Sequence, residues 1–345
     1  LEKDKFYSYK IFEKKNSLNL SDGYGIQLSA NSVKILNTIG FQKMNANDVC
    51  LPKKVNFFDA KSSKKICEIN ISQFNNINNR YTTLKRSKLI ELLLKNIPPE
   101  KIIYDSDIID IKNQNRISLL LRGKQTEEFD YLVAADGVYS KTKQILFKKE
   151  GLPEYFKSIA IRGKITNFEN SDISIYLGPN FHFVIYPINQ SKEFNFISII
   201  RKNLIEEEIL NTDLFKNSNF VEKLLNQISL KSKLNLIEKI DEIKCFPIFV
   251  SKKIQVPSSK NIFLTGDAFY SFPPSFAQGA SQSIEAANEL FQDINSNSSN
   301  YYKKRINHWR IHLGNQGKRA VLTDNLACSM LATGRLHTHL KVILR

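Results

Sequence analysis

Cysteine is scarce in this sequence, and its few cysteines are far apart. Four occur in 345 residues, at Cys50, Cys67, Cys245 and Cys328, and no two of them form a CxxC pair. A disulfide framework or a cysteine zinc site is therefore not predicted, and we expect reduced thiols in a cytoplasmic protein. The sequence also lacks any apolar run of about 18 residues, so it predicts no transmembrane helix.

The start of the sequence lacks two further features. There is no initiator Met, and no apolar segment follows the charged residues of Leu1-Glu2-Lys3-Asp4-Lys5. We therefore expect no signal peptide, and we interpret the chain as a fragment or a trimmed protein.

Acidic residues are outnumbered by basic ones. The chain has 34 Asp and Glu against 50 Lys and Arg, and half of the resulting excess lies in residues 301–345, where nine basic residues accompany Asp324 alone. Because Lys, Asn and Ile are abundant throughout the chain, we attribute the charge to compositional bias and expect no nucleic-acid partner. The basic C-terminal region has two interpretations, peripheral contact with an anionic membrane or a solvated helix face.

The hydrophobic pattern changes along the chain. With 42% hydrophobic residues, the chain exceeds what a single core usually holds, so we expect two domains or one interrupted domain. Helical patterns and buried strands occupy both ends and the region near 80–150, whereas 50–71 and 158–200 are rich in short strands. The sequence predicts an α/β nucleotide-binding domain interrupted by a mixed β-sheet domain. The expected elements are strands at 9–13, 131–135, 158–165, 173–177, 181–186, 194–200 and 262–267, and helices at 31–39, 84–97, 203–240 and 279–291.

The strongest motif follows the last predicted strand. Thr265-Gly266-Asp267-Ala268 ends this strand, Pro273-Pro274 form a turn, and Gln278-Gly279-Ala280 open a helix. Asp267 is placed to accept hydrogen bonds from ribityl or ribose hydroxyls, and Gly279 lets the backbone approach a ring closely. The helix N-terminus offers unpaired N–H groups and a partial positive charge to an anion. A strand, a Gly-Asp pair and a helix can be purely structural, but the Pro and Gln-Gly spacing favours a cofactor site.

This motif resembles the second FAD motif of the single-component flavoprotein hydroxylases, the salicylate-hydroxylase and ubiquinone-hydroxylase-like group of FAD-dependent aromatic-ring monooxygenases. Residues 23–31 are similar to the family's stretch after the second Rossmann strand, and residues 131–140 to its internal Asp-Gly motif. Arg86 falls where the family has an Arg near the flavin. The resemblance covers residues 9–335, and it includes Gly178-Pro179, Tyr186-Pro187 and Asn195-Phe196 of the expected substrate sheet.

The resemblance implies a Rossmann-like FAD-binding domain and a substrate-binding β-sheet domain. The FAD-binding domain would comprise residues 1–48, 80–152 and 256–345, and the substrate domain residues 49–79 and 153–255. The implied cofactor-binding residues are Glu13, Arg86, Asp136, Gly137, Gly266, Asp267, Pro274, Gly279 and Ala280. The expected substrate pocket contains His182, Tyr186, Phe272 and Pro273, with Phe181, Phe183 and Phe196 as candidates among which strand alternation must select. No catalytic residue is assigned.

The family chemistry implies a monooxygenase with FAD as cofactor and NAD(P)H as co-substrate, which hydroxylates an aromatic or quinone-precursor ring through a flavin hydroperoxide. Its partners would be a small aromatic or quinone-like substrate and molecular oxygen. Three alternatives stay open. They are a flavin reductase or dehydrogenase of the same fold, a non-catalytic remnant, and a membrane- or nucleic-acid-binding module, which only the basic C-terminal region supports.

The sequence departs from the family pattern in two places. The first strand and the GxGxxG loop, whose N–H groups hold the pyrophosphate, do not occur in it, and we expect them to precede Leu1. Glu13 then matches the acid after the second strand, which suits the adenosine ribose. The second departure is Phe269-Tyr270, where the family commonly has Ala-His. His337 and His339 form an HxH pair without further ligands, so no metal site is predicted.

Overall fold

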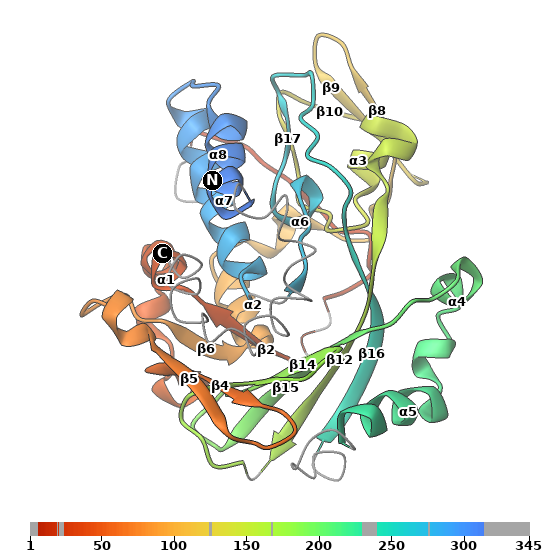
Figure 1. Ribbon diagram of the computed structural model, residues 1–345. Helices are drawn as coiled ribbons and strands as arrows, with labels where there is room; N and C mark the ends of the chain where they lie inside the picture. Colours follow the sequence, from red (N-terminus) through yellow and green to blue (C-terminus); the bar gives the residue numbers. More distant parts are fainter. Residues whose placement is uncertain are drawn as a thin grey trace.

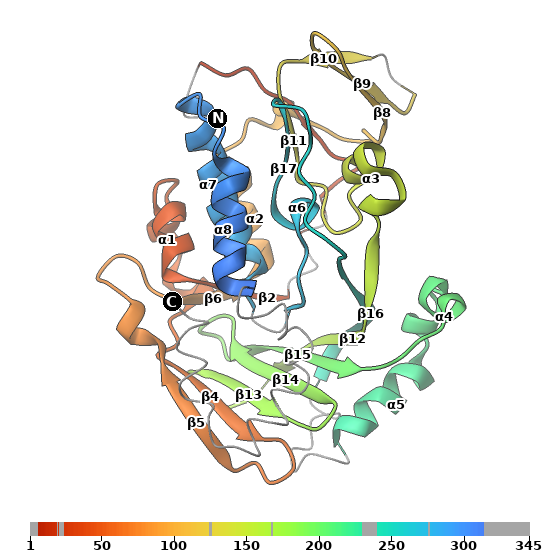
Figure 2. The same cartoon turned by 45° about the horizontal axis from the view of Figure 1, so that its top comes forward.

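The computed structural model describes residues 6–18, 20, 24–123, 126–166, 168–229, 240–274 and 277–313. A large curved sheet forms one half of the molecule, and helices with several small sheets form the other (Figures 1 and 2). The residues of the basic region beyond 313, including His337 and His339, lie outside the described residues. Within the described ranges, no helix is long and apolar enough to cross a membrane.

The large sheet has seven strands in the order β16-β12-β15-β14-β13-β4-β5. All neighbours in it are antiparallel except β13 and β4, which pair in parallel. The strands of this sheet are β4 (Lys54–Asp59), β5 (Lys65–Asn70), β12 (Pro153–Thr166), β13 (Ile173–Leu177), β14 (Phe181–Pro187), β15 (Glu193–Arg201) and β16 (Ile240–Ser251). The strands predicted between 158 and 200 are confirmed.

The two faces of this sheet have different neighbours. On one face, Phe181, Phe183 and Phe196 belong to a core cluster with Leu224 and Ile228 of α5 (Ser218–Ser229). The short helix α4 (Glu206–Leu210) lies on the same side (Figure 2). Because side chains alternate along a strand, Val184 and Tyr186 of β14 join a separate cluster on the opposite face. The three phenylalanines are therefore sheet core and do not share the face of Tyr186.

The other half of the molecule contains two short parallel pairs and two small antiparallel sheets. The parallel pairs are β1 (Ile11–Phe12) with β7 (Ile102–Ile103) and β11 (Leu132–Ala134) with β17 (Ile262–Leu264). One antiparallel sheet joins β2 (Gly25–Leu28), β6 (Thr82–Lys85) and β3 (Val49–Cys50), and the other joins β8 (Ile108–Asn113), β9 (Ile117–Leu121) and β10 (Glu127–Phe129). The helices are α1 (Ala30–Asn37), α2 (Arg86–Leu94), α3 (Lys141–Phe147), α6 (Gly266–Phe269), α7 (Gly279–Asn295) and α8 (Tyr301–Leu313).

Several predicted boundaries differ from the structure. The helix expected from position 84 begins at Arg86, because the two preceding residues pair with β2 as the end of β6. Gly266 and Asp267 do not end a strand; they form the first turn of α6. The antiparallel sheet of β8, β9 and β10 was not predicted. At position 49, β3 pairs with β6 and not with the large sheet.

The last described helix holds the strand that carries the Gly-Asp pair. The Leu264 N–H donates to the hydroxyl of Tyr302 at 2.7 Å, and the hydroxyl of Tyr301 donates to the Leu264 carbonyl at 3.2 Å. Both backbone groups of this β17 residue are thus satisfied by side chains of α8. On the other side, α7 packs through Ala280 and Ile284 against the core of α1, α2 and β2.

The two halves meet where β2 crosses the large sheet. The Gly25 N–H donates to the Asn195 side-chain oxygen at 2.8 Å. A Cβ at Gly25 would lie 2.5 Å from Ile188 Cγ2, 2.6 Å from Asn195 Cβ and 2.8 Å from Tyr186 Cε2. Only glycine permits this approach of strand to sheet.

Gly25→Ala should lower the free energy of unfolding by about 1–3 kcal/mol, because three side chains must move to accommodate one methyl group. Urea denaturation of the two proteins measures the difference. Gly279→Ala is the matched control, since a Cβ there meets no atom within 4 Å. Equal stability of Gly25→Ala and the unmodified chain would contradict the close contact.

Candidate functional site

The Gly-Asp turn depends on glycine at its first position. Gly266 has a φ of +56°, and a Cβ there would lie 2.9 Å from the hydroxyl oxygen of Ser283 on α7. The positive φ favours glycine because L side chains rarely adopt it, and the short distance to Ser283 leaves no room for a side chain. The turn therefore lets α6 contact α7 closely and places Asp267 in the first turn of α6.

The beginning of α7 is open. Space surrounds Gly279, where a Cβ would meet no atom within 4 Å, and among the described residues no side-chain hydrogen bond caps the first turn of this 17-residue helix. The first N–H groups of a helix have no partner within it, and they carry a partial positive charge. Gly279 thus presents an accessible, electropositive backbone.

One pocket joins these features. It is lined by Gly266, Asp267, Phe269, Tyr270, Phe272, Gly279, Gln282, Ser283, Ala286 and Arg305. Asp267 remains accessible at the mouth of this recess. Protein atoms nevertheless crowd it enough that burial raises the pKa of its carboxyl group above the usual 3.8. Such desolvation is typical of carboxylates that await a hydrogen-bonding ligand, although structural carboxylates show it as well.

Two predicted residues flank this pocket without lining it. The carbonyl of Pro274 accepts a hydrogen bond from the N–H of Ala277, which has an unusual φ of +51°. Ala280 turns toward α1 and packs in that core. Phe269 and Tyr270, which replace the family's Ala-His, both line the pocket, and Phe269 is almost completely buried.

The Asp136 carboxylate accepts two hydrogen bonds at the start of α3. One of its carboxylate oxygens accepts from the Ser140 hydroxyl at 2.6 Å and the other from the Thr142 N–H at 3.0 Å, so the side chain orders the start of α3. The next residue, Gly137, has a φ of +80°, which favours glycine at this turn.

Glu13 and Arg86 lie at the ends of other elements. Glu13 directly follows β1, and its carboxylate accepts from the Lys15 N–H at 3.0 Å. Arg86 begins α2 with an exposed side chain, and its N–H donates to the Tyr24 carbonyl at 2.8 Å. Neither residue lines the pocket around Asp267.

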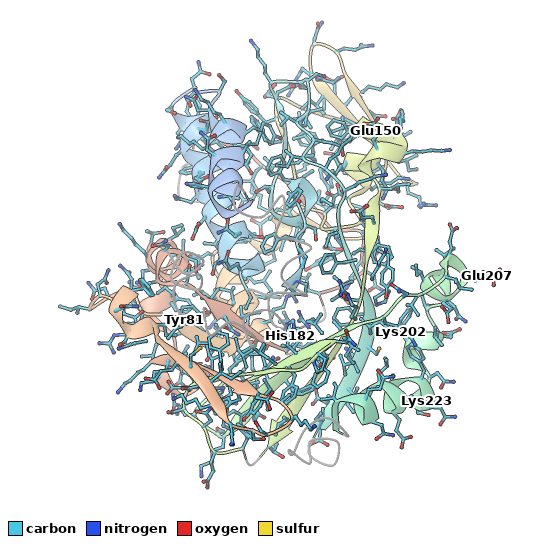
Figure 3. All side chains as sticks on the ribbon, in the orientation of Figure 1. Tyr81, Glu150, His182, Lys202, Glu207 and Lys223 are labelled. Atoms are coloured by element: carbon cyan, nitrogen blue, oxygen red, sulfur yellow. The ribbon has the colours of Figure 1, made fainter. Side chains whose placement is uncertain are left out.

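The expected substrate residues His182 and Tyr186 share one face of β14, which is the face toward β2. Figure 3 shows His182 where the large sheet meets the other half of the molecule. Burial lowers the pKa of His182 to about 4, so the ring is neutral at pH 7. Tyr186 is 4% exposed and bonds to Gln27 of β2, which also accepts from the Tyr81 hydroxyl at 2.7 Å. Burial raises the pKa of Tyr186, which keeps its phenol protonated.

One residue on this face was missed. Arg162 of β12 acts electrostatically on Tyr186 and on Arg86, and its guanidinium carbon lies 5.7 Å from the centre of the Tyr24 ring. The sequence contained a signal, because Arg162 is the one charged residue within the apolar run Ser158-Ile159-Ala160-Ile161-Arg162-Gly163. Among the described residues, no group of His, Cys, Asp and Glu could hold a metal ion.

Sequence comparison finds relatives among flavin-dependent oxygenases. The chain is 26% identical over 221 residues to the chloroplastic zeaxanthin epoxidase of an Oncidium hybrid cultivar, a match that covers 61% of this chain and 32% of that protein. It is 22% identical over 275 residues to the 3-amino-4-hydroxybenzoate 2-monooxygenase PtmB3 of Streptomyces platensis, with 77% and 68% covered. The match to zeaxanthin epoxidase thus spans about a third of that relative. No family model matches the chain.

Solved structures share the fold. The 2,6-dihydroxypyridine-3-hydroxylase of Arthrobacter nicotinovorans superposes with a TM-score of 0.74 at 14% identity, covering 96% of this chain and 88% of that one. Klebsiella pneumoniae HpxO, solved with FAD and uric acid, gives 0.63 at 16% identity, with 81% and 72% covered. The fold is that of the FAD-binding hydroxylases. The sequence relatives, at 22–26% identity, are named as an epoxidase and a monooxygenase.

The burial of His182 predicts a pH-dependent stability. Its pKa falls from 6.5 to about 4 on folding, so the unfolded chain binds a proton that the folded chain does not. The free energy of unfolding should therefore decrease as the pH falls from 6.5 to 4, by at most about 3 kcal/mol. His182→Gln should remove this part of the decrease, whereas His308→Gln, at an exposed position on α8, should leave it. Urea denaturation at pH 7 and pH 5 compares them, and parallel loss in all three proteins would refute the assignment.

Proposed function

We propose that the protein binds FAD between α6 and α7 and acts as an NAD(P)H-using monooxygenase on an aromatic or quinone-precursor ring. The observation that carries this proposal is the pocket in which Asp267, Gly266 and the open start of α7 at Gly279 come together. A hydrogen-bond acceptor, a side-chain-free backbone and an electropositive helix end suit the ribityl chain and ring of a flavin. The same fold holds FAD in HpxO.

Each of these residues has a separate part in holding the cofactor. The Asp267 carboxylate accepts hydrogen bonds from cofactor hydroxyls, and Gly279 lets the ring lie against the backbone. The first N–H groups of α7 stabilise negative charge that develops on the ring during reduction. When bound, FAD supplies the redox chemistry, in which it takes electrons from NAD(P)H and activates molecular oxygen.

The substrate ring would lie between the segment that follows α6 and the large sheet. Phe272 and Pro273 belong to this segment, while His182 and Tyr186 belong to the sheet face toward β2. These side chains are aromatic or apolar apart from a neutral imidazole and a protonated phenol, a composition that suits a flat ring and excludes water. Molecular oxygen is the other substrate.

Asp267→Ala should weaken FAD binding by about tenfold or more, because a hydrogen bond to a charged group contributes roughly 1.5–3 kcal/mol. The protein without cofactor should not lose stability, since burial disfavours the charged carboxylate. Quenching of flavin fluorescence measures the dissociation constant. Asp213→Ala removes an exposed carboxylate that pairs with Lys216 outside the pocket, and is the matched control.

A second variant separates binding from folding at the same pocket. Gly279→Ala adds one methyl group to open space, so the fold should tolerate it while the ring loses its close approach. Unchanged FAD affinity in both Asp267→Ala and Gly279→Ala would refute the assigned pocket.

The substrate class can be tested by stimulation of NAD(P)H oxidation. Purified protein supplied with FAD should oxidise NAD(P)H faster in the presence of at least one phenol, hydroxybenzoate or polyprenylated phenol, with consumption of oxygen and formation of a hydroxylated product. Mass spectrometry identifies the added oxygen atom. Oxidation of NAD(P)H without a hydroxylated product across the panel would replace the proposal by a flavin reductase of the same fold.

A further inference from the structure

Arg305 of α8 is the largest side chain that the described part of the fold buries completely. Only 2% of its surface is exposed. Its guanidinium donates to the side-chain oxygen of Gln282 at 2.8 Å and pairs with the Glu289 carboxylate at 3.3 Å. Both partners belong to α7, which runs beside α8 (Figures 1 and 2), and they lie two helical turns apart. One side chain therefore attaches α8 to α7 at two points.

The same side chain lines the pocket around Asp267. Arg305 and Gln282 are both lining residues, together with Gly279. A longer contact of 3.5 Å joins the guanidinium to the backbone carbonyl of Gln282. The N–H of Gln282 in turn donates at 2.9 Å to the carbonyl of Gln278, the residue before Gly279. Arg305 thus holds the residue whose backbone hydrogen bond closes the first turn of α7.

Packing of the two helices does not by itself require an arginine at this position. Desolvation of a guanidinium costs so much free energy that an apolar side chain of similar volume is often equally stabilising. Among the described residues, the buried Nε of Arg305 has no hydrogen-bond partner, so the cost is incompletely offset. A buried ionic group that adds little stability can still select one arrangement of the elements that it joins.

The arrangement that Arg305 selects is that of the two walls of the pocket. At its first turn, α8 bonds through the hydroxyls of Tyr301 and Tyr302 to the backbone of Leu264, just before the Gly-Asp turn. One turn further along α8, Arg305 bonds to α7, whose start forms the opposite wall. The same helix is therefore hydrogen-bonded to the supports of both walls.

We propose that Arg305 is a positioning residue for the flavin, which acts through Gln282 to fix the direction of the first N–H groups of α7. These groups stabilise negative charge on the ring only if they point at it, and an error of about 1 Å in such a group can cost about a hundredfold in rate. The planar guanidinium suits this task because it holds Gln282 and Glu289 at once. The inference rests on the proposed function, because it concerns how the proposed FAD site is held.

The experiment removes the donors of Arg305 and follows FAD binding. Arg305→Met should weaken FAD binding about tenfold, because the hydrogen bond of a charged group to Gln282 is lost. The visible circular dichroism of the bound flavin, which reports the orientation of the ring, should change as well. Arg305→Lys can donate to Gln282 but not to both partners at once, so it should recover part of both properties. Glu289 keeps His308 as a partner at 3.2 Å, so no carboxylate is left alone.

A double-mutant cycle tests the route through Gln282. Gln282→Met removes the acceptor of the 2.8 Å bond and leaves the ion pair of Arg305 with Glu289 in place. It should weaken FAD binding by a factor similar to that of Arg305→Met, and the double variant should lose no more than either single variant, because all three lack the same hydrogen bond. Additive losses would contradict the route. If Arg305→Met does not fold, Gln282→Met alone gives the comparison with the unmodified protein.

Leu224→Ala separates positioning from general stability. Leu224 of α5 is 2% exposed and belongs to the core on the opposite face of the large sheet. Its truncation leaves a cavity and should lower the melting temperature, but FAD affinity and the flavin spectrum should stay unchanged. If Leu224→Ala weakens FAD binding as much as Arg305→Met does, the effect of Arg305 is one of stability alone and the proposal is wrong.

Hydrogen exchange tests the same role without cofactor. In Arg305→Met the amides of residues 282–286 should exchange about tenfold faster than in the unmodified protein, whereas those of residues 222–229 in α5 should not change. Unchanged exchange at 282–286, or unchanged affinity in a protein that binds FAD, overturns the role of Arg305. Faster exchange in a protein that binds no FAD supports Arg305 as the residue that holds α7 and refutes only the proposed function.

Discussion

The contact between Gly25 and the large sheet determines how the two halves of the molecule meet. Its N–H bonds to Asn195, and the absence of a side chain lets β2 lie directly on Tyr186 and Ile188. Gln27 reaches Tyr186, and the Tyr24 carbonyl fixes the start of α2. The hydrogen bond and the missing side chain at Gly25 hold β2 against the sheet face that carries Tyr186.

The sequence predicted the elements well and their ends less well. The strands β12 to β15 and the helices beginning near positions 31 and 279 follow from hydrophobic period alone, whereas β16 was not predicted and the helix expected at 203–240 is divided into α4 and α5. The position of Gly266-Asp267 and Gly279 in one pocket follows from a family motif. The boundary between β6 and α2 could not be predicted from the sequence. Whether Leu84 continues a strand or starts a helix depends on its partner across the sheet at Ile26, which lies 58 positions away.

The structure shows which of the predicted site residues lie together, and their roles stay predictions. For Asp136 the motif predicts a cofactor contact, and the carboxylate also orders the start of the adjacent helix. Arg162 shows the opposite case. A charged residue in an apolar strand was visible, but its neighbours come from segments around 24, 86 and 246, and only the fold brings them together.

The two tyrosine hydroxyls that bind Leu264 give α8 an influence over distant chemistry. Since β17 ends one residue before the Gly-Asp turn, a helix that contributes nothing to the pocket's acid or its open backbone still determines where both are held. Any event that draws α8 away, whether a ligand on its outer face or a cut in the connection after Asn295, would loosen the turn while leaving the large sheet intact. The position of α8 therefore controls the geometry of the Gly-Asp turn.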